Sequence, residues 1–305
     1  MQQNQNLGTY LPSGFLIYIN SLSNPESTEA HELSHFYQDI LSLNGLLTFL
    51  NSSRLINLVK LKLASIEERI TLSKITKIIQ EDSLYHQIQD LASLTGVKSA
   101  ECDKLLNQVE SWKLNRYVRE INLQGDPGPL RAYDIYTKFN NGEVEVLPLD
   151  AFVIKEGISH LHQEIFDLHD ENDCKHYFWP YRVVEFIIGK TFKIEKLEDK
   201  KKLLILFFIS LMDHNPMYRL FALLPLYNEF DDTKKLFFAA FEKIRSKKLF
   251  NDYKDGIKEI RKKVIHLIKD KAYKNSLINY CNALDCVKKI WLNNPEKIYD
   301  CFLDK

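Results

Sequence analysis

The residues best suited to chemistry are His31, Glu32 and His35, which form an H-E-x-x-H motif in the segment HELSH. Residues i and i+4 lie on one face of a helix, so both imidazoles can bind one Zn²⁺. The glutamate beside the first histidine can then reach a water molecule at the metal and act as a general base. The motif therefore predicts a zinc site with His31 and His35 as ligands and Glu32 as the base.

A second cluster, in the segment EGISHLHQE, supplies candidates for a third ligand. A catalytic zinc usually has three protein ligands and one open position. Glu156, His160 and Glu164 recur at steps of four and share one helix face. Glu156 or His160 could be the third ligand, and the other could orient an imidazole. Asp39, four residues after His35, is another candidate for that orienting role.

The first motif requires a helix, and the surrounding pattern predicts one. Residues 15–20 (FLIYIN) are typical of a strand. Asn24 is a suitable N-cap, with Pro25 at the first helical position, and apolar residues then recur at steps of three and four. We expect an amphipathic helix over 25–50, bent at Gly45.

Farther along the chain the pattern alternates between helices and strands. We expect helices at 54–80, 82–94 and 99–113, strands at 117–123, 133–139 and 144–147, and a helix at 151–170. Gly125 to Pro129 predicts a turn, and the Asn141-Gly142 dipeptide predicts a tight hairpin. Asp150 is positioned to cap the helix that carries the second cluster.

The composition favours a predominantly α, α+β fold. The 305 residues are 45% hydrophobic and 27% charged, and contain only 10 Gly and 9 Pro, which are too few for an all-β protein rich in tight turns. From residue 178 onward the pattern is almost wholly helical. We predict an α+β domain over 1–190, with a small sheet and the motif helix, followed by an all-α domain over 191–305.

The formal net charge is zero, but the charge is divided between the halves of the chain. Residues 190–305 contain 25 Lys and Arg against 16 Asp and Glu, and the preceding residues contain 16 against 25. A basic second domain could bind an acidic protein partner. Nucleic acid is an unlikely partner, because the total charge is balanced and no phosphate-binding glycine motif occurs.

Cysteine usage and hydropathy favour a cytoplasmic protein. The five cysteines form no C-x-x-C pair and are widely spaced, as expected in a reducing compartment. The N-terminal segment lacks the pattern of a signal peptide. The longest apolar run, Leu203 to Met212, is about half of a membrane span, so we expect a buried core helix and no membrane partner.

Together, the strand, the helix with HELSHFYQD and the later helix with KEGISHLHQE resemble the gluzincin-type zinc metallopeptidases. The similarity covers roughly residues 14–190 and is greatest to members whose third ligand is the Glu of an E-G-x-A-like segment. It implies Glu156 as the third zinc ligand and a peptide or protein substrate. Ser159 stands where such segments more usually carry a small apolar residue.

The implied reaction is hydrolysis of a peptide or amide bond, which also requires a group that stabilises the developing oxyanion. Tyr177, Tyr181 and His162 are near the second cluster in sequence. We rank Tyr181 first, because the Trp179-Pro180-Tyr181 turn could direct it toward the zinc.

Two other functions fit the same residues. The protein could be a non-catalytic helical interaction protein in which the metal is structural or absent. It could also be a metallopeptidase that is active only when a partner binds. A closed four-ligand site would favour the first alternative, because it leaves no position for water.

Overall fold

The computed structural model describes residues 8–11, 16–19, 25–64, 77, 80–81, 104–123, 126–166, 178–265 and 271–303. These residues form a predominantly helical α+β fold, as the sequence predicts. The helix expected at 82–94 lies outside the described residues. Within the described ranges, no helix combines the length and the apolar character needed to cross a bilayer.

The motif lies on α1 (Pro25–Leu41), which is followed almost at once by α2 (Leu43–Ala64). The prediction of a single helix over 25–50 is therefore wrong, because the first helix ends at Leu41 and a second begins at Leu43, with Ser42 between them. The Ser42 hydroxyl donates to Gln38 O at 2.6 Å and accepts from Gly45 N at 3.1 Å. It therefore provides a hydrogen-bond partner for a backbone carbonyl at the end of α1 and for a backbone amide at the start of α2. At Gly45 the two helices approach so closely that a Cβ would lie 2.2 Å from Asp39 Cα.

Two antiparallel sheets are present in the described residues. The strand predicted near 15–20 is β2 (Leu16–Ile19), which pairs with β1 (Gly8–Leu11). The larger sheet has the order β3-β4-β5, formed by Val109–Leu123, Asp126–Phe139 and Val144–Pro148. The predicted hairpin at Asn141-Gly142 joins β4 to β5, and Gly142 has a φ of 83°.

The structure corrects two expectations about β3 and β4. Residues 109–113 were expected in a helix, but they begin β3, after a short helical turn at Leu106–Gln108. Residues 126–129 were expected in a turn, but they begin β4. Pro127 and Pro129 are tolerated there because β5 pairs only with Asp134–Lys138, so this end of β4 has a neighbouring strand on one side.

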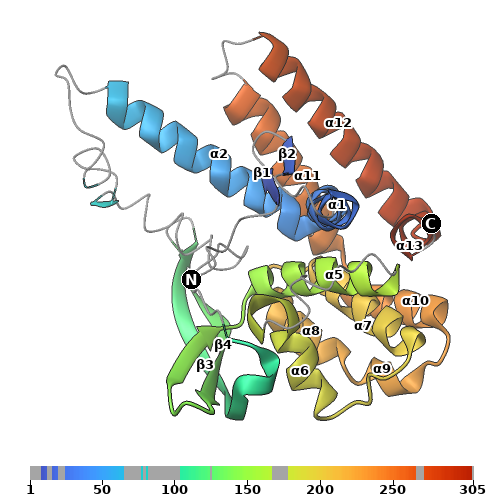
Figure 1. The fold of residues 1–305 in the computed structure, drawn as a ribbon. Helices are drawn as coiled ribbons and strands as arrows, with labels where there is room; N and C mark the ends of the chain where they lie inside the picture. The colour runs from blue at the N-terminus through green and yellow to red at the C-terminus, as the bar shows by residue number, and fades with distance from the viewer. Residues whose placement is uncertain are drawn as a thin grey trace.

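The second cluster lies on α5 (Ala151–Ile165), whose N-cap is Asp150 as predicted. The Asp150 side chain accepts a hydrogen bond from Phe152 N at 2.9 Å. Figure 1 shows α5 between α1 and α2 on one side and the remaining lower helices on the other. Helix α5 packs against α1 on one face and α7 (Leu197–Ser210) on the other.

The remaining described α-helices lie on the two sides of α5, together with α1 and α2 on one side or with α7 on the other. They are α6 (Val183–Gly189), α8 (Pro216–Leu223), α9 (Leu226–Glu229), α10 (Thr233–Ile244), α11 (Lys247–Glu259), α12 (Lys271–Asn293) and α13 (Glu296–Leu303). Helices α11 and α12 lie beside α2 and α1, so the C-terminal part of the chain contacts the motif helix directly.

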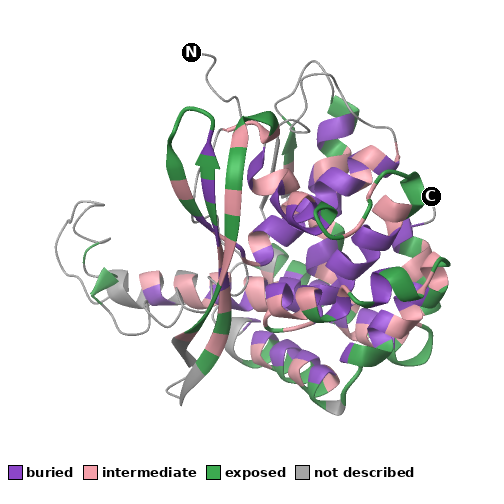
Figure 2. Ribbon diagram, turned by 90° about the horizontal axis from the view of Figure 1, so that it is seen from below, coloured by how far each residue is buried: buried purple, intermediate pink, exposed green. Residues whose placement is uncertain are grey.

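One hydrophobic core extends through both halves of the chain (Figure 2). It contains Leu46 of α2, Ile158 of α5 and Trp291 of α12, all completely buried. The Trp291 indole donates to Leu41 O at 2.8 Å, and the Tyr253 hydroxyl donates to the same oxygen at 3.2 Å. The predicted boundary near residue 190 is therefore not marked by a gap in the packing.

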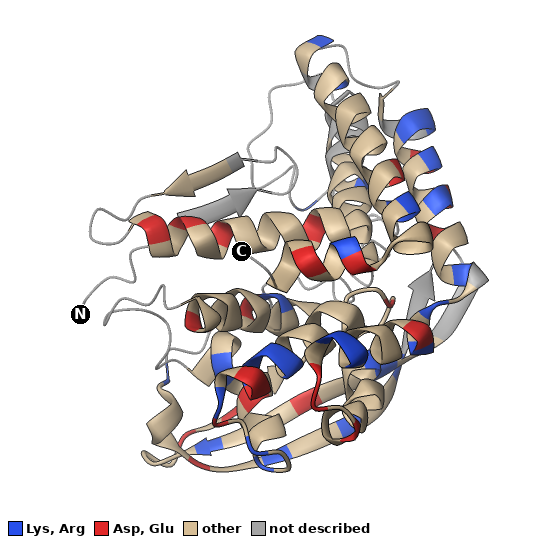
Figure 3. Cartoon of the chain, turned by 90° about the vertical axis from the view of Figure 1, so that its right-hand side faces the viewer, with Lys and Arg blue, Asp and Glu red and all other residues tan. Residues whose placement is uncertain are grey.

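The division of charge in the sequence is not a division in space. Figure 3 shows basic and acidic residues interspersed along the lower helices. Arg54 pairs with Glu259 at 2.9 Å, and Lys200 pairs with Glu164 at 2.7 Å. Each of these ion pairs joins a residue of the first 190 to a residue of the remainder. Only the Lys200–Glu164 pair follows the net charges of the two halves, because in the other pair the base, Arg54, belongs to the acidic half.

Candidate metal centre

The packing of α1 on α5 brings His31, His35 and Glu156 together. The Nε2 atoms of the two histidines lie 3.2 Å apart. His31 Nε2 lies 3.3 Å from Glu156 Oε2, and His35 Nε2 lies 3.5 Å from Glu156 Oε1. The three side chains are only 13–15% exposed, so they form a small, largely buried triangle of donor atoms.

The spacing of these side chains is compatible with a tetrahedral zinc ion. Zinc binds histidine nitrogen and carboxylate oxygen at about 2.0–2.1 Å, which places tetrahedral ligand atoms about 3.3–3.4 Å from one another. The two nitrogens are 3.2 Å apart, and each lies 3.3–3.5 Å from a different oxygen of the Glu156 carboxylate, so one ligand atom from each of the three residues can be chosen with all three within 4.8 Å of one another. An ion seated on this triangle would be bound by two imidazoles and one carboxylate and would retain a fourth position.

The ring of His31 is held by a side chain on the same helix as Glu156. Its Nδ1 lies 3.3 Å from Oε1, the side-chain carbonyl oxygen of Gln163. The Gln163 amide group donates to Ser27 O at 3.2 Å and to Ser27 Oγ at 2.9 Å, which fixes the carbonyl oxygen toward the imidazole. A carbonyl oxygen facing Nδ1 favours the tautomer with its proton on Nδ1, and Nε2 is then available as a ligand.

The ring of His35 has a corresponding partner in Ser159. Its Nδ1 lies 3.4 Å from the Ser159 oxygen. Gln38 Nε2 donates to Ser159 Oγ at 3.1 Å and to Lys155 O at 3.2 Å, so the serine is itself fixed. Ser159 is the residue at which the sequence departs from the E-G-x-A-like pattern, and the structure gives its hydroxyl a role that an apolar residue could not perform.

The electrostatics of the triangle favour a negatively charged Glu156. Burial alone would raise the pKa of this carboxyl, but the charges and hydrogen bonds of His35 and His31 outweigh it and lower the pKa well below its usual range. Burial likewise opposes protonation of His31, yet the hydrogen bond and the charge of Glu156 raise the pKa of the imidazole. The carboxylate is therefore ionised and available to bind a cation.

Glu32 and Tyr181, the residues expected to assist the reaction, both lie near His31. Glu32 is 8% exposed and close enough for its charge to favour protonation of His31. The ring of Tyr181 packs edge-on against the His31 imidazole, with ring centroids 5.9 Å apart. The other two candidates differ: Tyr177 is outside the described residues, and His162 is bonded to Ser34 and to a backbone carbonyl.

His160 does not belong to this triangle, so the interpretation of His160 as the third ligand does not match the structure. Its Nε2 lies 3.5 Å from Glu164 Oε1, in a separate group that also includes Glu185. Lys200 lies 2.7 Å from Glu164, and Arg182 donates to Glu185. Each carboxylate of this second group is thus already paired with a cation, which makes the group a charge-balanced cluster.

Asp39 does not take the orienting role that its spacing suggested. It lies on α1 one turn after His35, but its carboxylate pairs with Lys155 Nζ at 3.1 Å. Both side chains are about nine-tenths or more buried, so each neutralises a charge that would be costly alone. This ion pair joins α1 to α5 next to the triangle of His31, His35 and Glu156 and helps to fix the relative position of the two helices.

Sequence reasoning missed Gln163 and Ser159 as orienting residues. Both lie on the α5 face that begins with Glu156: Ser159 is three residues after it and Gln163 is seven. That helical spacing was a signal that could have identified them, because residues at i+3 and i+7 follow residue i along one face.

Comparison with protein-family models, with curated proteins and with solved structures finds no match for this chain. The class of site therefore rests on the arrangement of its own residues, which form a candidate mononuclear metal centre on an H-E-x-x-H helix.

Proposed function

We propose that the protein is a zinc-dependent hydrolase of the metallopeptidase kind, which cleaves a peptide or amide bond. One observation carries the proposal: His31 Nε2, His35 Nε2 and the Glu156 carboxylate form one group in which a ligand atom of each residue lies within 4.8 Å of the others, and the nearest contacts are 3.2–3.5 Å, a spacing compatible with ligands of one zinc ion. The arrangement of these residues on two helices agrees with the gluzincin-like pattern of the sequence. Zinc at this position would supply Lewis-acid chemistry, polarising a carbonyl group and acidifying water.

An open fourth position favours a catalytic metal over a structural one. Among the described residues, this group of possible ligands contains three members. A structural zinc site is usually closed by four protein ligands, whereas a catalytic site has three. The partial exposure of the three side chains leaves them within reach of a substrate.

The chain's own residues provide the other functions that hydrolysis requires. Glu32 would accept the proton of the attacking water and deliver it to the leaving amine. Tyr181, beside His31, would donate a hydrogen bond to the oxygen that becomes negative during attack. Gln163 and Ser159 would hold the two imidazoles in the orientation that presents Nε2.

We further propose that the protein works in a reducing compartment such as the cytoplasm. The cysteines of the described region, Cys281, Cys286 and Cys301, are free. Burial raises the pKa of the Cys281 thiol to about 11, so it remains a protonated core residue.

The experiment compares metal content with hydrolysis in three forms of the full-length protein. Elemental analysis of the wild type should find about one zinc per chain. Glu32→Gln should retain that zinc and lose hydrolysis of a quenched fluorescent peptide library, because the carboxamide cannot accept the proton. His35→Ala should lose both the zinc and the activity.

Two results would contradict the proposal. If the wild type binds no zinc after reconstitution, there is no metal centre. If Glu32→Gln cleaves peptides as fast as the zinc-loaded wild type, the assigned base is wrong. Zinc binding without cleavage of generic peptides would instead support the partner-activated form of the enzyme, provided that an added partner restores Glu32-dependent activity.

A further inference from the structure

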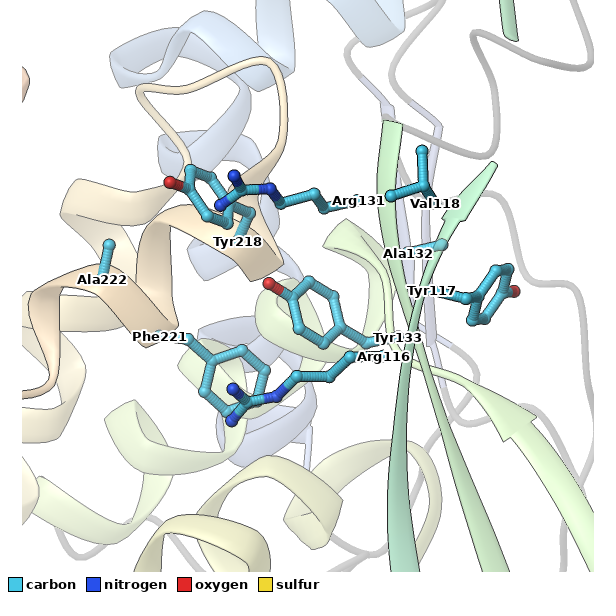
Figure 4. Close-up of a pocket in the computed structure, with 9 residues that line it drawn as sticks. All are labelled: Arg116, Tyr117, Val118, Arg131, Ala132, Tyr133, Tyr218, Phe221 and Ala222. Carbon is cyan, nitrogen blue, oxygen red and sulfur yellow. The ribbon is translucent and has the colours of Figure 1, made fainter. Parts of the chain in front are cut away.

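A cleft between the β3–β4 hairpin and α8 lies outside the metal centre. It has a volume of about 420 Å³ and is lined mainly by arginine and aromatic side chains. Figure 4 shows Arg116 and Arg131 extending from the strands toward the helix, with Tyr133 between them. Cross-strand pairing explains this arrangement, because Arg116 is opposite Tyr133 and Arg131 is opposite Val118 on the same face of the sheet.

Each guanidinium of the cleft is held against an aromatic ring of α8. Arg131 Cζ lies 4.4 Å from the centroid of the Tyr218 ring, and Arg116 Cζ lies 5.3 Å from that of Phe221. Such stacking orients a guanidinium and leaves its N–H donors in the plane available to a ligand. The two arginine side chains are therefore already oriented, so they lose little conformational entropy when a ligand binds.

The positive charges of the cleft are not neutralised within it. Its lining contains no Asp or Glu. In the part of the chain that the structure describes, neither Arg116 nor Arg131 forms an ion pair with a carboxylate. Two exposed arginines in an otherwise aromatic cleft create a local positive potential that attracts an anion.

Tyr133 adds a neutral donor between the two cations. Its side chain is 6% exposed, and its ring packs against Phe221 with centroids 4.9 Å apart. Burial raises the pKa of the hydroxyl, although the nearby arginines oppose this, so the group keeps its proton at neutral pH. A protonated hydroxyl can donate one further hydrogen bond to an anion held by the arginines.

We propose that this cleft binds a phosphate monoester carried by a small organic molecule. The two guanidinium forks and the Tyr133 hydroxyl supply more donors than one carboxylate can accept, whereas a phosphate monoester presents three terminal oxygens. The volume exceeds that of a phosphate ion alone and is within the usual range of small-molecule sites. The aromatic rings of the cleft would contact the organic part of the ligand.

The test is a ligand-observed NMR titration of the full-length protein at constant ionic strength. The probes are phenyl phosphate, inorganic phosphate and benzoate, which separate the contributions of phosphate and ring. Phenyl phosphate should bind saturably and roughly tenfold more tightly than benzoate, because its phosphate has three terminal oxygens and a higher negative charge, whereas benzoate has two oxygens and a single charge. Inorganic phosphate should compete for the same site with lower affinity.

Arginine variants then locate the binding. Arg116→Gln and Arg131→Gln should each weaken phenyl phosphate binding roughly tenfold, since each removes one charged fork. Arg119→Gln is the matched control: it removes one charge from β3, but residue 119 alternates to the opposite face from Arg116 and should change affinity less than about twofold. Arg116→Lys, which retains the charge and is compatible with the fold, should give an intermediate loss.

The titration is repeated with zinc-loaded protein and with His31→Ala, because a metal centre can also bind phosphate. Binding to the cleft should be equal in both, so this result is independent of the proposed hydrolase. The proposal is overturned if phenyl phosphate does not bind saturably, if benzoate binds equally well, or if Arg119→Gln weakens binding as much as Arg116→Gln. Binding of an acidic peptide with no binding of phenyl phosphate would also overturn it.

Discussion

Ser34 Oγ lies 2.8 Å from His162 Nδ1, and this contact connects α1, the helix of the H-E-x-x-H motif, to α5. The other ring nitrogen of His162 lies 3.2 Å from Phe302 O on α13. A carbonyl can only accept, so Nε2 carries the proton and Nδ1 accepts from the Ser34 hydroxyl. A neutral His162 thus bridges α1, α5 and α13, and its contact on α1, Ser34, lies between the two zinc-ligand candidates His31 and His35.

Stability should fall as the pH is lowered through the range in which His162 becomes protonated. Burial lowers the pKa of His162 to about 4, although the hydrogen bond to Phe302 opposes this, whereas the unfolded chain has the usual value of 6.5. Between these values the unfolded chain binds more protons, so the free energy of unfolding decreases as the pH falls from 6.5 toward 4. The loss from this group is at most about 3 kcal/mol.

Urea unfolding at a series of pH values measures this dependence. His162→Gln can retain hydrogen bonds but cannot titrate, so its stability should change less over the same range. If the wild type and His162→Gln lose stability in parallel between pH 6.5 and 4, another group is responsible.

Removing the carboxylate of Glu156 should remove the metal. Glu156→Ala leaves two imidazoles, and we expect the zinc affinity to fall at least roughly 100-fold. Glu164→Ala is the control on the same helix, because Glu164 pairs with Lys200 and His160 and not with the triangle. Equilibrium dialysis with zinc would measure both, and equal zinc loss in the two variants would refute the assigned ligand.

Gln163 should influence zinc affinity without contacting the metal. Gln163→Leu removes the oxygen that faces His31 Nδ1, and we expect zinc to bind roughly 10- to 100-fold more weakly. Ser27→Ala removes one of the two acceptors that hold Gln163, so its effect should be smaller. Competition with a chelator gives the two affinities, and circular dichroism confirms that both variants are folded. A Gln163→Leu protein with wild-type zinc affinity would show that the His31 orientation is set elsewhere.

A side chain at position 45 should be strongly destabilising. The Cβ of Gly45→Ala would lie 2.2 Å from Asp39 Cα, so the two helices must separate, at a cost of about 3 kcal/mol or more. Gly189→Ala is the matched control, because its Cβ would meet only Ile194 Cδ1 at 3.9 Å and should change stability by less than about 0.5 kcal/mol. Thermal unfolding of the two variants would check this, and similar melting temperatures would contradict it.

Local signals in the sequence predicted much of the fold. The N-cap at Asp150, the hairpin at Asn141-Gly142 and the strand near residue 16 are formed by short-range interactions, and all three are present. The start of β3 at Val109 and the extension of β4 through Pro127 were missed, because strand pairing over a long hairpin overrides local helix and turn preferences.

The four-residue spacing of His31 and His35 was enough to place both on one helix face, because residues i and i+4 lie on the same side of any α-helix. The sequence also placed Glu156 and His160 about one turn apart on a second helix, roughly 6 Å along its axis, and could not choose between them. Only the tertiary structure made that choice. The register at which α5 packs on α1, fixed by contacts such as the Asp39–Lys155 ion pair, directs Glu156 to the imidazoles and leaves His160 beside Glu164.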